Sequence, residues 1–558
     1  MRRLAGRGIR RFAGRGIGRL ARDVLLMAIA TGISRVFGLA REAAIADRFG
    51  ASAAYDAFLI AFFVPHFLRS LLAEGALSTA FVPIYTKLHI QGEAEKPDHQ
   101  ADPGTTAHLP ADALRLHGSA DAAYRREDAD RFASNLLSLL LLLFPVTVVA
   151  GILLAPIYVP FLASGFPAEK LDLAIVLARF VFPFIAFVGL AAVFMGILNA
   201  QRRFFSASFA PVWFNVGMIV GVLVATTAFP SRPIYGLAAG VLIGGAGQLL
   251  SLIPALRATG FRFRFHLLPL HPGVLGFARR MAPAVIALAV AQINLLVDNK
   301  IASHLPDGGI ASLQYAMRLF QLPLGVFAVS IATALLPRLS AATARGERGR
   351  FSRYLGDGFA STAFVLLPAM VGLLVIGRDL IRLLFEHGSF GPAETVRTTR
   401  VLFAYLIGLL PYGLVYIQTR ACYALGRTAL PVIAAVCAVG VNVALDLALV
   451  GPLREAGLAL ATAAAGLVNA AVLLFFLRAT VRWDRRLART LGTVVLGVAL
   501  LAGVAYGTRR LFGDGSPAVA VAVPTVAGVL FYALYARLTG LWTLIGGFGQ
   551  VAEPRSNE

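Results

Sequence analysis

Long apolar segments alternate with short polar connections along most of the chain. About fourteen of these segments are long enough to cross the hydrocarbon core of a bilayer, which takes roughly 20 helical residues. The pattern predicts an all-α polytopic membrane protein with about fourteen transmembrane helices. The predicted spans are residues 23–48, 55–87, 133–162, 170–198, 207–229, 233–257, 272–302, 309–337, 354–377, 395–424, 429–450, 455–478, 488–508 and 516–541.

Two polar stretches do not fit the spanning pattern. The longest connection, residues 89–130, is rich in Ala, Asp, Pro, His and Gly without periodicity, which predicts a flexible cytoplasmic insertion. The segment Arg378 to Phe390 (RDLIRLLFEHGSF) is too short and too charged to span, which predicts an interfacial helix on the outer side.

Basic residues in the connections predict the orientation. An even number of spans places both termini on one side, and connections on that side carry roughly three times as many Arg and Lys as those on the other. The termini are therefore expected in the cytoplasm. Residues 1–22 contain eight arginines and no convincing signal-peptidase site, so they are interpreted as an uncleaved basic tail.

A weak internal repeat predicts two parallel lobes. Thr79–Pro83 (TAFVP) matches Thr333–Pro337 (TALLP), and Arg179 with Phe182 matches Arg400 with Phe403. Six spans per half is an even number, so the lobes are expected to be related by a pseudo-two-fold axis along the membrane normal, around a central cavity. The predicted regions are a tail (1–22), an N-lobe (23–257), a C-lobe (258–480), a final helix pair (481–545) and a cytoplasmic C-terminal tail (546–558).

Composition excludes several classes of protein. Of the 558 residues, 58% are hydrophobic and 14% charged, far fewer charges than the roughly 25% of a soluble domain. The net charge of +22 does not indicate nucleic-acid binding, because the arginines lie in short loops between apolar spans. The two cysteines predict no disulfide framework, and no P-loop, GxSxG or zinc-protease motif indicates an enzyme or a bound cofactor.

Charged residues inside the first two predicted spans are the strongest functional signal. A charge near the bilayer centre costs roughly 2.5–3.5 kcal/mol on insertion scales, so such residues normally face a cavity or a partner. The candidate substrate-binding residues are Arg35, Arg41, Asp56, Arg69 and Glu74, with Arg318 in the eighth span. Guanidinium groups donate paired hydrogen bonds to phosphate, so the pattern predicts a cavity for a phosphate-bearing anion. The alternative is that some arginines reach the interface or pair locally, as Arg69 would with Glu74.

A second set of polar residues falls in the predicted C-lobe. Asp298 lies in the seventh span, Asn442 and Asp446 lie four residues apart in the eleventh, and Thr462 follows in the twelfth. Carboxylate, amide and hydroxyl oxygens suit a hard cation, so these residues form a candidate sodium site. The alternative is that Asp298 pairs with Lys300 while Asn442 and Asp446 bond to each other.

The motifs SRVxGxAR, DAFxxAFxxPxxLR and AEGALSxAFVP run almost without a break from Ser34 to Pro83 and resemble the MurJ (MviN) lipid II flippases. That family lies within the multidrug/oligosaccharidyl-lipid/polysaccharide exporter superfamily. The resemblance implies alternating access in a bacterial cytoplasmic membrane, with lipid II (the undecaprenyl-diphosphate-linked peptidoglycan precursor) as substrate and the surrounding phospholipid as the other partner. It further implies a lipid tail held against the last two helices.

The resemblance also implies roles for particular residues. Asp56 matches a functionally important acidic residue, and the sodium ligands would include a backbone carbonyl near Leu458. Ser70 and Phe63 depart from the pattern, because many relatives have basic residues there. The arginines implied to line the cavity are Arg35, Arg41, Arg69 and Arg318.

Other functions were weighed from the sequence, and a membrane-embedded transferase is disfavoured because no loop carries paired catalytic carboxylates. A sibling exporter would move another polyprenyl-linked oligosaccharide, of the O-antigen or capsule type. A cation-coupled drug exporter is disfavoured, because its cavity should be acidic rather than lined with arginines. A non-transporting scaffold would dock cell-wall synthesis proteins through the basic tail and the 89–130 connection, but it would not need arginines within the membrane.

Overall fold

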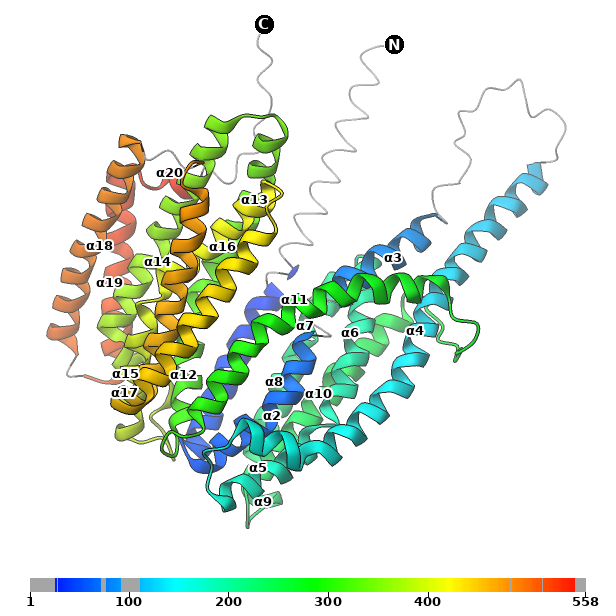
Figure 1. The fold of residues 1–558 in the computed structure, drawn as a ribbon, viewed down its shortest axis with the longest axis horizontal. Helices are drawn as coiled ribbons and strands as arrows, with labels where there is room; N and C mark the ends of the chain where they lie inside the picture. Colours follow the sequence, from blue (N-terminus) through cyan, green and yellow to red (C-terminus); the bar gives the residue numbers. More distant parts are fainter. Residues whose placement is uncertain are drawn as a thin grey trace, which may run out of the picture. The chain divides into compact units, whose positions relative to one another are not determined.

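The computed structural model consists almost entirely of helices, and no β-strand occurs in the part of the chain it describes (Figure 1). The described residues are 26–27, 29–71, 77–91, 111–480, 484–513 and 515–546. A first helix covers residues 29–49. The others are α2 (Ala53–Leu71), α3 (Leu77–Gln91), α4 (Ala111–Leu162), α5 (Ala168–Val181), α6 (Phe184–Ala200), α7 (Phe204–Phe209), α8 (Pro211–Leu223), α9 (Ala225–Ala228), α10 (Ile234–Arg257), α11 (Pro272–Ala302), α12 (Gly309–Pro323), the π-helix η2 (Leu324–Ala328), α13 (Val329–Ala344), α14 (Arg348–Phe385), α15 (Pro392–Leu406), α16 (Leu409–Ala424), α17 (Ala429–Leu477), α18 (Arg485–Phe512), α19 (Pro517–Leu538) and α20 (Thr543–Gly546).

The polytopic all-α fold is confirmed. Among the described residues, nine helices are long and apolar enough to cross a membrane, or ten if α15 and α16, bent by 41°, form one span. Helix α17 contains two predicted spans and breaks at Arg454, whose backbone is not helical (φ 51°, ψ −129°). The first helix, α2 and α11, which carry Arg35, Arg41, Asp56, Arg69 and Asp298, are not among the nine. The total of fourteen spans therefore stays a prediction.

The predicted flexible insertion at 89–130 is wrong for its second half. Helix α4 begins at Ala111, so residues 111–130 are helical and continuous with the span that follows. The segment contains Ala, Leu, Arg and Glu, which favour a helix despite its polarity. Side chains from its end are anchored: Asp128 contacts His271 (3.1 Å) and Asp130 accepts from Tyr85 (3.3 Å). Residues 92–110 lie outside the described part.

The prediction that Arg378–Phe390 forms a separate helix is also wrong, and its interfacial location stays a prediction. Helix α14 runs without interruption from Arg348 to Phe385, so most of this segment is the last part of a long helix. Arg, Leu and Ile at 378–384 continue a helix readily, and the charges had suggested a break that the backbone does not make. The turn comes at Gly388, whose positive φ of 51° suits glycine.

The chain divides into two units. The first comprises residues 1–45, 57–161 and 167–293, and the second comprises 46–56, 162–166 and 294–558. Two connectors from the N-terminal half, 46–56 and 162–166, thus belong to the second unit, and the last boundary falls inside α11. The predicted lobe limits, their pseudo-two-fold relation and the lipid-tail groove stay predictions.

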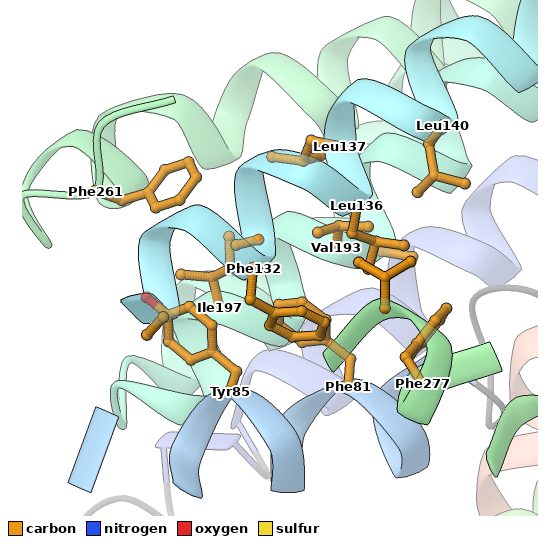
Figure 2. Close-up of a cluster of buried hydrophobic side chains, with 14 of the residues drawn as sticks. Phe81, Tyr85, Phe132, Leu136, Leu137, Leu140, Val193, Ile197, Phe261 and Phe277 are labelled. Carbon is orange, nitrogen blue, oxygen red and sulfur yellow. The ribbon is translucent and has the colours of Figure 1, made fainter. Parts of the chain in front are cut away.

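A buried aromatic cluster holds together one end of the first unit (Figure 2). Phe81 and Tyr85 of α3 stack on each other, and Phe81 also stacks on Phe132 of α4, with ring centroids 5.3–5.4 Å apart. Val193 of α6 and Phe277 of α11 complete the cluster. Offset ring pairs of this kind add roughly 0.5–1.5 kcal/mol each beyond their buried area, so the cluster fixes α3 against α4 and α6.

Helices α8 and α10 approach each other through glycines. Gly217 and Gly221 are four apart on α8, and Gly236, Gly240 and Gly244 repeat at the same spacing on α10. A Cβ at Gly217 would lie 2.2 Å from the Cα of Gly244. Small residues at a four-residue spacing allow membrane helices to pack backbone against backbone, where lipid supplies no hydrophobic drive for association. The glycines therefore form a seam that fixes α8 on α10.

In the second unit, α18 and α19 lie beside α14 (Figure 1). Two ion pairs join α18 to α14. Arg509 Nε donates to Asp379 at 2.6 Å, and this carboxylate is only 8% exposed. Arg486 and Asp357 pair at 3.4 Å at the other end of the two helices, with both side chains more than a third exposed. Because only the first pair is shielded from water, only that pair is expected to matter for stability.

We expect Arg509→Ala to destabilise the protein by about 3 kcal/mol, because it leaves the buried Asp379 carboxylate without compensation. The measurement is thermal unfolding of the purified protein in detergent. Arg486→Ala is the matched control, because it removes the same side chain from the exposed pair and should cost no more than about 1 kcal/mol. Equal losses for the two variants would contradict the assignment.

Candidate functional site

Arg41 is the best-defined arginine of the candidate site. It lies on the first helix, and its side chain is 12% exposed. Its Nη1 donates to the side-chain oxygen of Asn215 on α8 at 3.0 Å, and its Nη2 pairs with the adjacent Glu42 carboxylate. The guanidinium also lies 6.0 Å from the centre of the Phe214 ring. A charged side chain is thus held in a fixed position inside the first unit.

The pairing with Glu42 corrects part of the sequence argument. The sequence alone predicts Arg41 to be a positive charge available to a phosphate-bearing anion. Glu42 is 3% exposed and contacts Arg41 directly, so this pair carries little net charge. Adjacent residues on a helix diverge by about 100°, and long side chains can still reach each other when the surroundings exclude water.

The other arginines of the first unit have different surroundings. Arg35 is exposed on the first helix, and Arg69 is partly buried near the end of α2. Arg69 lies 3.2 Å from the His66 ring nitrogen one helical turn before it. Glu74, proposed as a binding residue or as the partner of Arg69, lies outside the described residues.

Asp56 has a structural position in the second unit. Its carboxylate, 1% exposed, accepts the backbone N–H groups of Gly308 (2.8 Å) and Ala311 (2.9 Å). These are donors at the start of α12, where a negative charge is favoured by unpaired N–H groups and the helix dipole. The φ of +80° at Gly308 suits glycine, and a Cβ there would lie 2.0 Å from the carbonyl oxygen of Ala51. Asp56 therefore fixes the connector 46–56 to the start of α12.

Helix α12 also carries Arg318, which is partly buried one turn beyond Tyr315. Tyr315 is fully buried and donates to the carbonyl oxygen of Gly50, a second link between α12 and the connector. Arg41 and Arg69 belong to the first unit and Arg318 to the second, so the convergence of the four arginines stays a prediction.

The predicted cation ligands of α11 and α17 meet in the second unit. Asn442 Nδ2 donates to Asp446 Oδ2 at 2.8 Å, as the alternative interpretation had proposed. The network extends further, because Asn294 Nδ2 donates both to Asp298 Oδ2 (3.0 Å) and to Asn442 Oδ1 (2.8 Å). The carboxyl groups of Asp298 and Asp446 are close enough to interact electrostatically. Two carboxylates so close repel each other unless a proton or a cation neutralises them.

Thr462, the fourth predicted ligand, has a local partner. Its hydroxyl donates to the Leu458 carbonyl oxygen one turn earlier on α17, at 3.0 Å. Its own carbonyl oxygen accepts from the Tyr412 hydroxyl of α16 at 3.3 Å. Contact between Thr462 and the carboxylates stays a prediction.

The network has unused capacity for a cation. The Oδ1 atoms of Asn294, Asp298 and Asp446 are buried and have no hydrogen-bond partner among the described residues. Buried polar atoms are nearly always paired in proteins, so three such oxygens in one network call for an explanation. Carboxylate and amide oxygens are the ligands that hard cations prefer, so the residues present fit the predicted sodium ion.

Sequence reasoning missed three residues of these sites: Glu42, Asn215 and Asn294. For Asn294 a signal was present, because NLLVD at 294–298 and NVALD at 442–446 share an Asn four residues before an Asp. Each Asn donates to its own Asp in the structure. Asn215 gave no comparable signal, since it is a single polar residue in an apolar span.

Comparison with known proteins gives a consistent result. A model of the family described as lipid II flippase MurJ matches residues 45–525. The probable lipid II flippase MurJ of Vibrio cholerae serotype O1 is 33% identical over 457 residues, which cover 81% of this chain and 82% of that protein.

Solved structures agree. The structure of a lipid II flippase MurJ in an inward closed conformation is 28% identical, with a TM-score of 0.74 over 93% of this chain and 100% of that one. An inward-facing MATE family transporter of the MOP superfamily is 14% identical, with a TM-score of 0.61 over 84% of this chain and 98% of that one, and so shares the fold. The family match spans most of the chain, and the relative exceeds 30% identity over most of both proteins. The chain belongs to the lipid II flippase MurJ family.

Proposed function

We propose that this chain flips lipid II from the inner to the outer leaflet of the bacterial cytoplasmic membrane, with both termini in the cytoplasm. Family membership supports the substrate. The observation that carries the proposal is the environment of Arg41. Its side chain is 12% exposed, and its guanidinium is held by Asn215 and Glu42. Its Nε–H has no hydrogen-bond partner among the described residues. A guanidinium with N–H groups left over from its protein contacts can donate them to a phosphate oxygen.

The proposed mechanism is alternating access. Arg35, Arg41, Arg69 and Arg318 bind the diphosphate in an inward-open cavity, the saccharide crosses in water, and the lipid tail stays in the bilayer along α18 and α19. Moving negative charge outward across an inside-negative membrane releases roughly 2.3 kcal/mol per charge per 100 mV, so the membrane potential favours this direction.

We also propose that Na⁺ binds the second unit as a coupling ion. Asn294, Asp298, Asn442 and Asp446 would hold it, and Thr462 is a further predicted ligand. A bound cation would neutralise the two adjacent carboxylates and accept the unused oxygens of the network.

The test is in cells depleted of their own lipid II flippase and rescued with this chain. An external enzyme that cleaves only exposed lipid II gives a product that measures flipping. We expect product with the wild type and roughly a tenfold or greater loss with Arg41→Ala or Arg318→Ala, because a hydrogen bond to a charged group contributes about 1.5–3 kcal/mol.

Arg350→Ala is the control, because Arg350 is 59% exposed and pairs with Glu347 one turn away, so product should be unchanged. No product from a well-expressed, membrane-inserted wild type would exclude lipid II as the substrate and favour a sibling exporter of another polyprenyl-linked oligosaccharide. Product that survives both arginine substitutions would contradict the arginine-lined cavity.

A further inference from the structure

Asn215 connects α8 to the first helix by hydrogen bonds on both sides of its amide. Its side-chain oxygen accepts from Arg41 Nη1 at 3.0 Å. Its Nδ2 donates to the carbonyl oxygens of Ser34 (3.4 Å) on the first helix and Pro211 (3.3 Å) on its own helix. The residue is 6% exposed, so these groups have no bulk water as an alternative partner.

The partners determine which way the amide points. Two of them are carbonyl oxygens, which can only accept, and the third is a guanidinium, which can only donate. The amide oxygen must therefore face Arg41 and the amide nitrogen must face the two carbonyls. Aspartate at this position would lack both donors, and leucine would lack every polar group.

The contacts of Arg41 leave one part of its guanidinium free. Asn215 occupies Nη1 and Glu42 occupies Nη2, while the Phe214 ring lies 6.0 Å from the guanidinium carbon. The Nε–H is buried and has no hydrogen-bond partner among the described residues. A guanidinium has five N–H groups, so the second N–H on each terminal nitrogen and the Nε–H remain beyond these two bonds.

We infer that Asn215 is a positioning residue for Arg41, which orients the guanidinium so that its remaining N–H groups meet a phosphate oxygen of the lipid diphosphate. The inference rests on the proposed function. An arginine free to change rotamer would lose conformational entropy on binding, and the hydrogen bond that Arg41 donates to Asn215 removes part of that loss in advance. Glu42 alone could not do this, because it is the neighbour of Arg41 on the same helix and moves with it.

The experiment measures binding of lipid II to the purified full-length protein in nanodiscs. The variants are Asn215→Leu, Arg41→Ala and the double substitution, and undecaprenyl diphosphate serves as a second probe without the saccharide. We expect Asn215→Leu to weaken binding of both probes roughly tenfold. Adding Asn215→Leu to Arg41→Ala should have no further effect, because a residue that acts through Arg41 has nothing left to position.

Thr227→Ala is the control, because Thr227 is exposed and its hydroxyl bonds only one turn back, to Val224. If Asn215→Leu does not fold, Asn215→Ser replaces it: serine leaves space but cannot reach Arg41, and the expectations are the same. Losses that multiply in the double variant would overturn the inference, because Asn215 would then act independently of Arg41. Unchanged binding in the single variant would also overturn it. A wild type that binds neither probe would instead refute the proposed function.

Discussion

Gly217→Ala is expected to destabilise the first unit strongly, because it adds a methyl group where the backbones of α8 and α10 touch. Its Cβ would lie 2.2 Å from the Cα and 2.3 Å from the backbone nitrogen of Gly244. Backbone atoms cannot rotate away as a side chain can, so the helices must separate. Overpacking typically costs about 1–3 kcal/mol, and the upper part of that range is expected here. The measurement is the melting temperature in detergent, together with the yield of folded protein.

Gly247→Ala is the matched control on α10. A Cβ there would lie 3.7 Å from the Cβ of Trp213, which is an ordinary van der Waals contact. Alanine favours a helix over glycine by about 1 kcal/mol, so this variant should be as stable as the wild type or slightly more stable. If Gly217→Ala melts at the wild-type temperature, the two helices do not pack as closely as described.

The second large effect is the stabilisation expected when sodium binds the network of Asn294, Asp298, Asn442 and Asp446. Replacing choline chloride by NaCl at constant ionic strength should raise the melting temperature of the wild type, since a ligand at 100 times its Kd stabilises by about 2.7 kcal/mol. Asp446→Asn should abolish this rise, because it removes one of the two carboxylates. Without sodium the same variant should be at least as stable as the wild type, because the repulsion between Asp298 and Asp446 is relieved.

The different expectations for Asp446→Asn with and without sodium distinguish a cation site from a purely structural network. If the carboxylates only held helices together, Asp446→Asn would lower the melting temperature by the same amount in both salts. Potassium chloride is a second control for a non-specific salt effect. A wild type that responds equally to sodium and choline would contradict the proposed site, whatever the variant does.

The sequence was sufficient for the helical fold, because long apolar segments leave a membrane chain few other ways to pair its backbone groups. The helix boundaries predicted from the sequence were wrong where charge and helix propensity disagreed. Residues 111–130 and 378–385 are polar or charged, yet they contain good helix formers and continue the helices beside them. Length and polarity identify what cannot span a membrane, but they do not show where a helix ends.

The candidate site was less predictable, for two physical reasons. Arg41 and Asn215 are 174 residues apart, and nothing local to either indicates the contact. Asp56 was identified as an unusual charge, but its role at the start of α12 depends on backbone groups, which leave no mark in the sequence. The repeated glycines of α8 and α10 and the paired Asn–Asp spacing were visible in the sequence. Their partners could be assigned only from the packing.

The link between Asp56 and α12 has a consequence for synthesis. Asp56 precedes its partner Gly308 by 252 residues, so its carboxylate leaves the ribosome long before α12 exists. At roughly 5–20 residues per second the delay is on the order of tens of seconds. During that time the first helices are in the membrane with a carboxylate whose final donors have not been made. With both termini in the cytoplasm, as proposed, the connector 46–56 lies on the outer side. Nascent chains shorter than about 350 residues should then expose it to externally added protease, and longer chains should protect it.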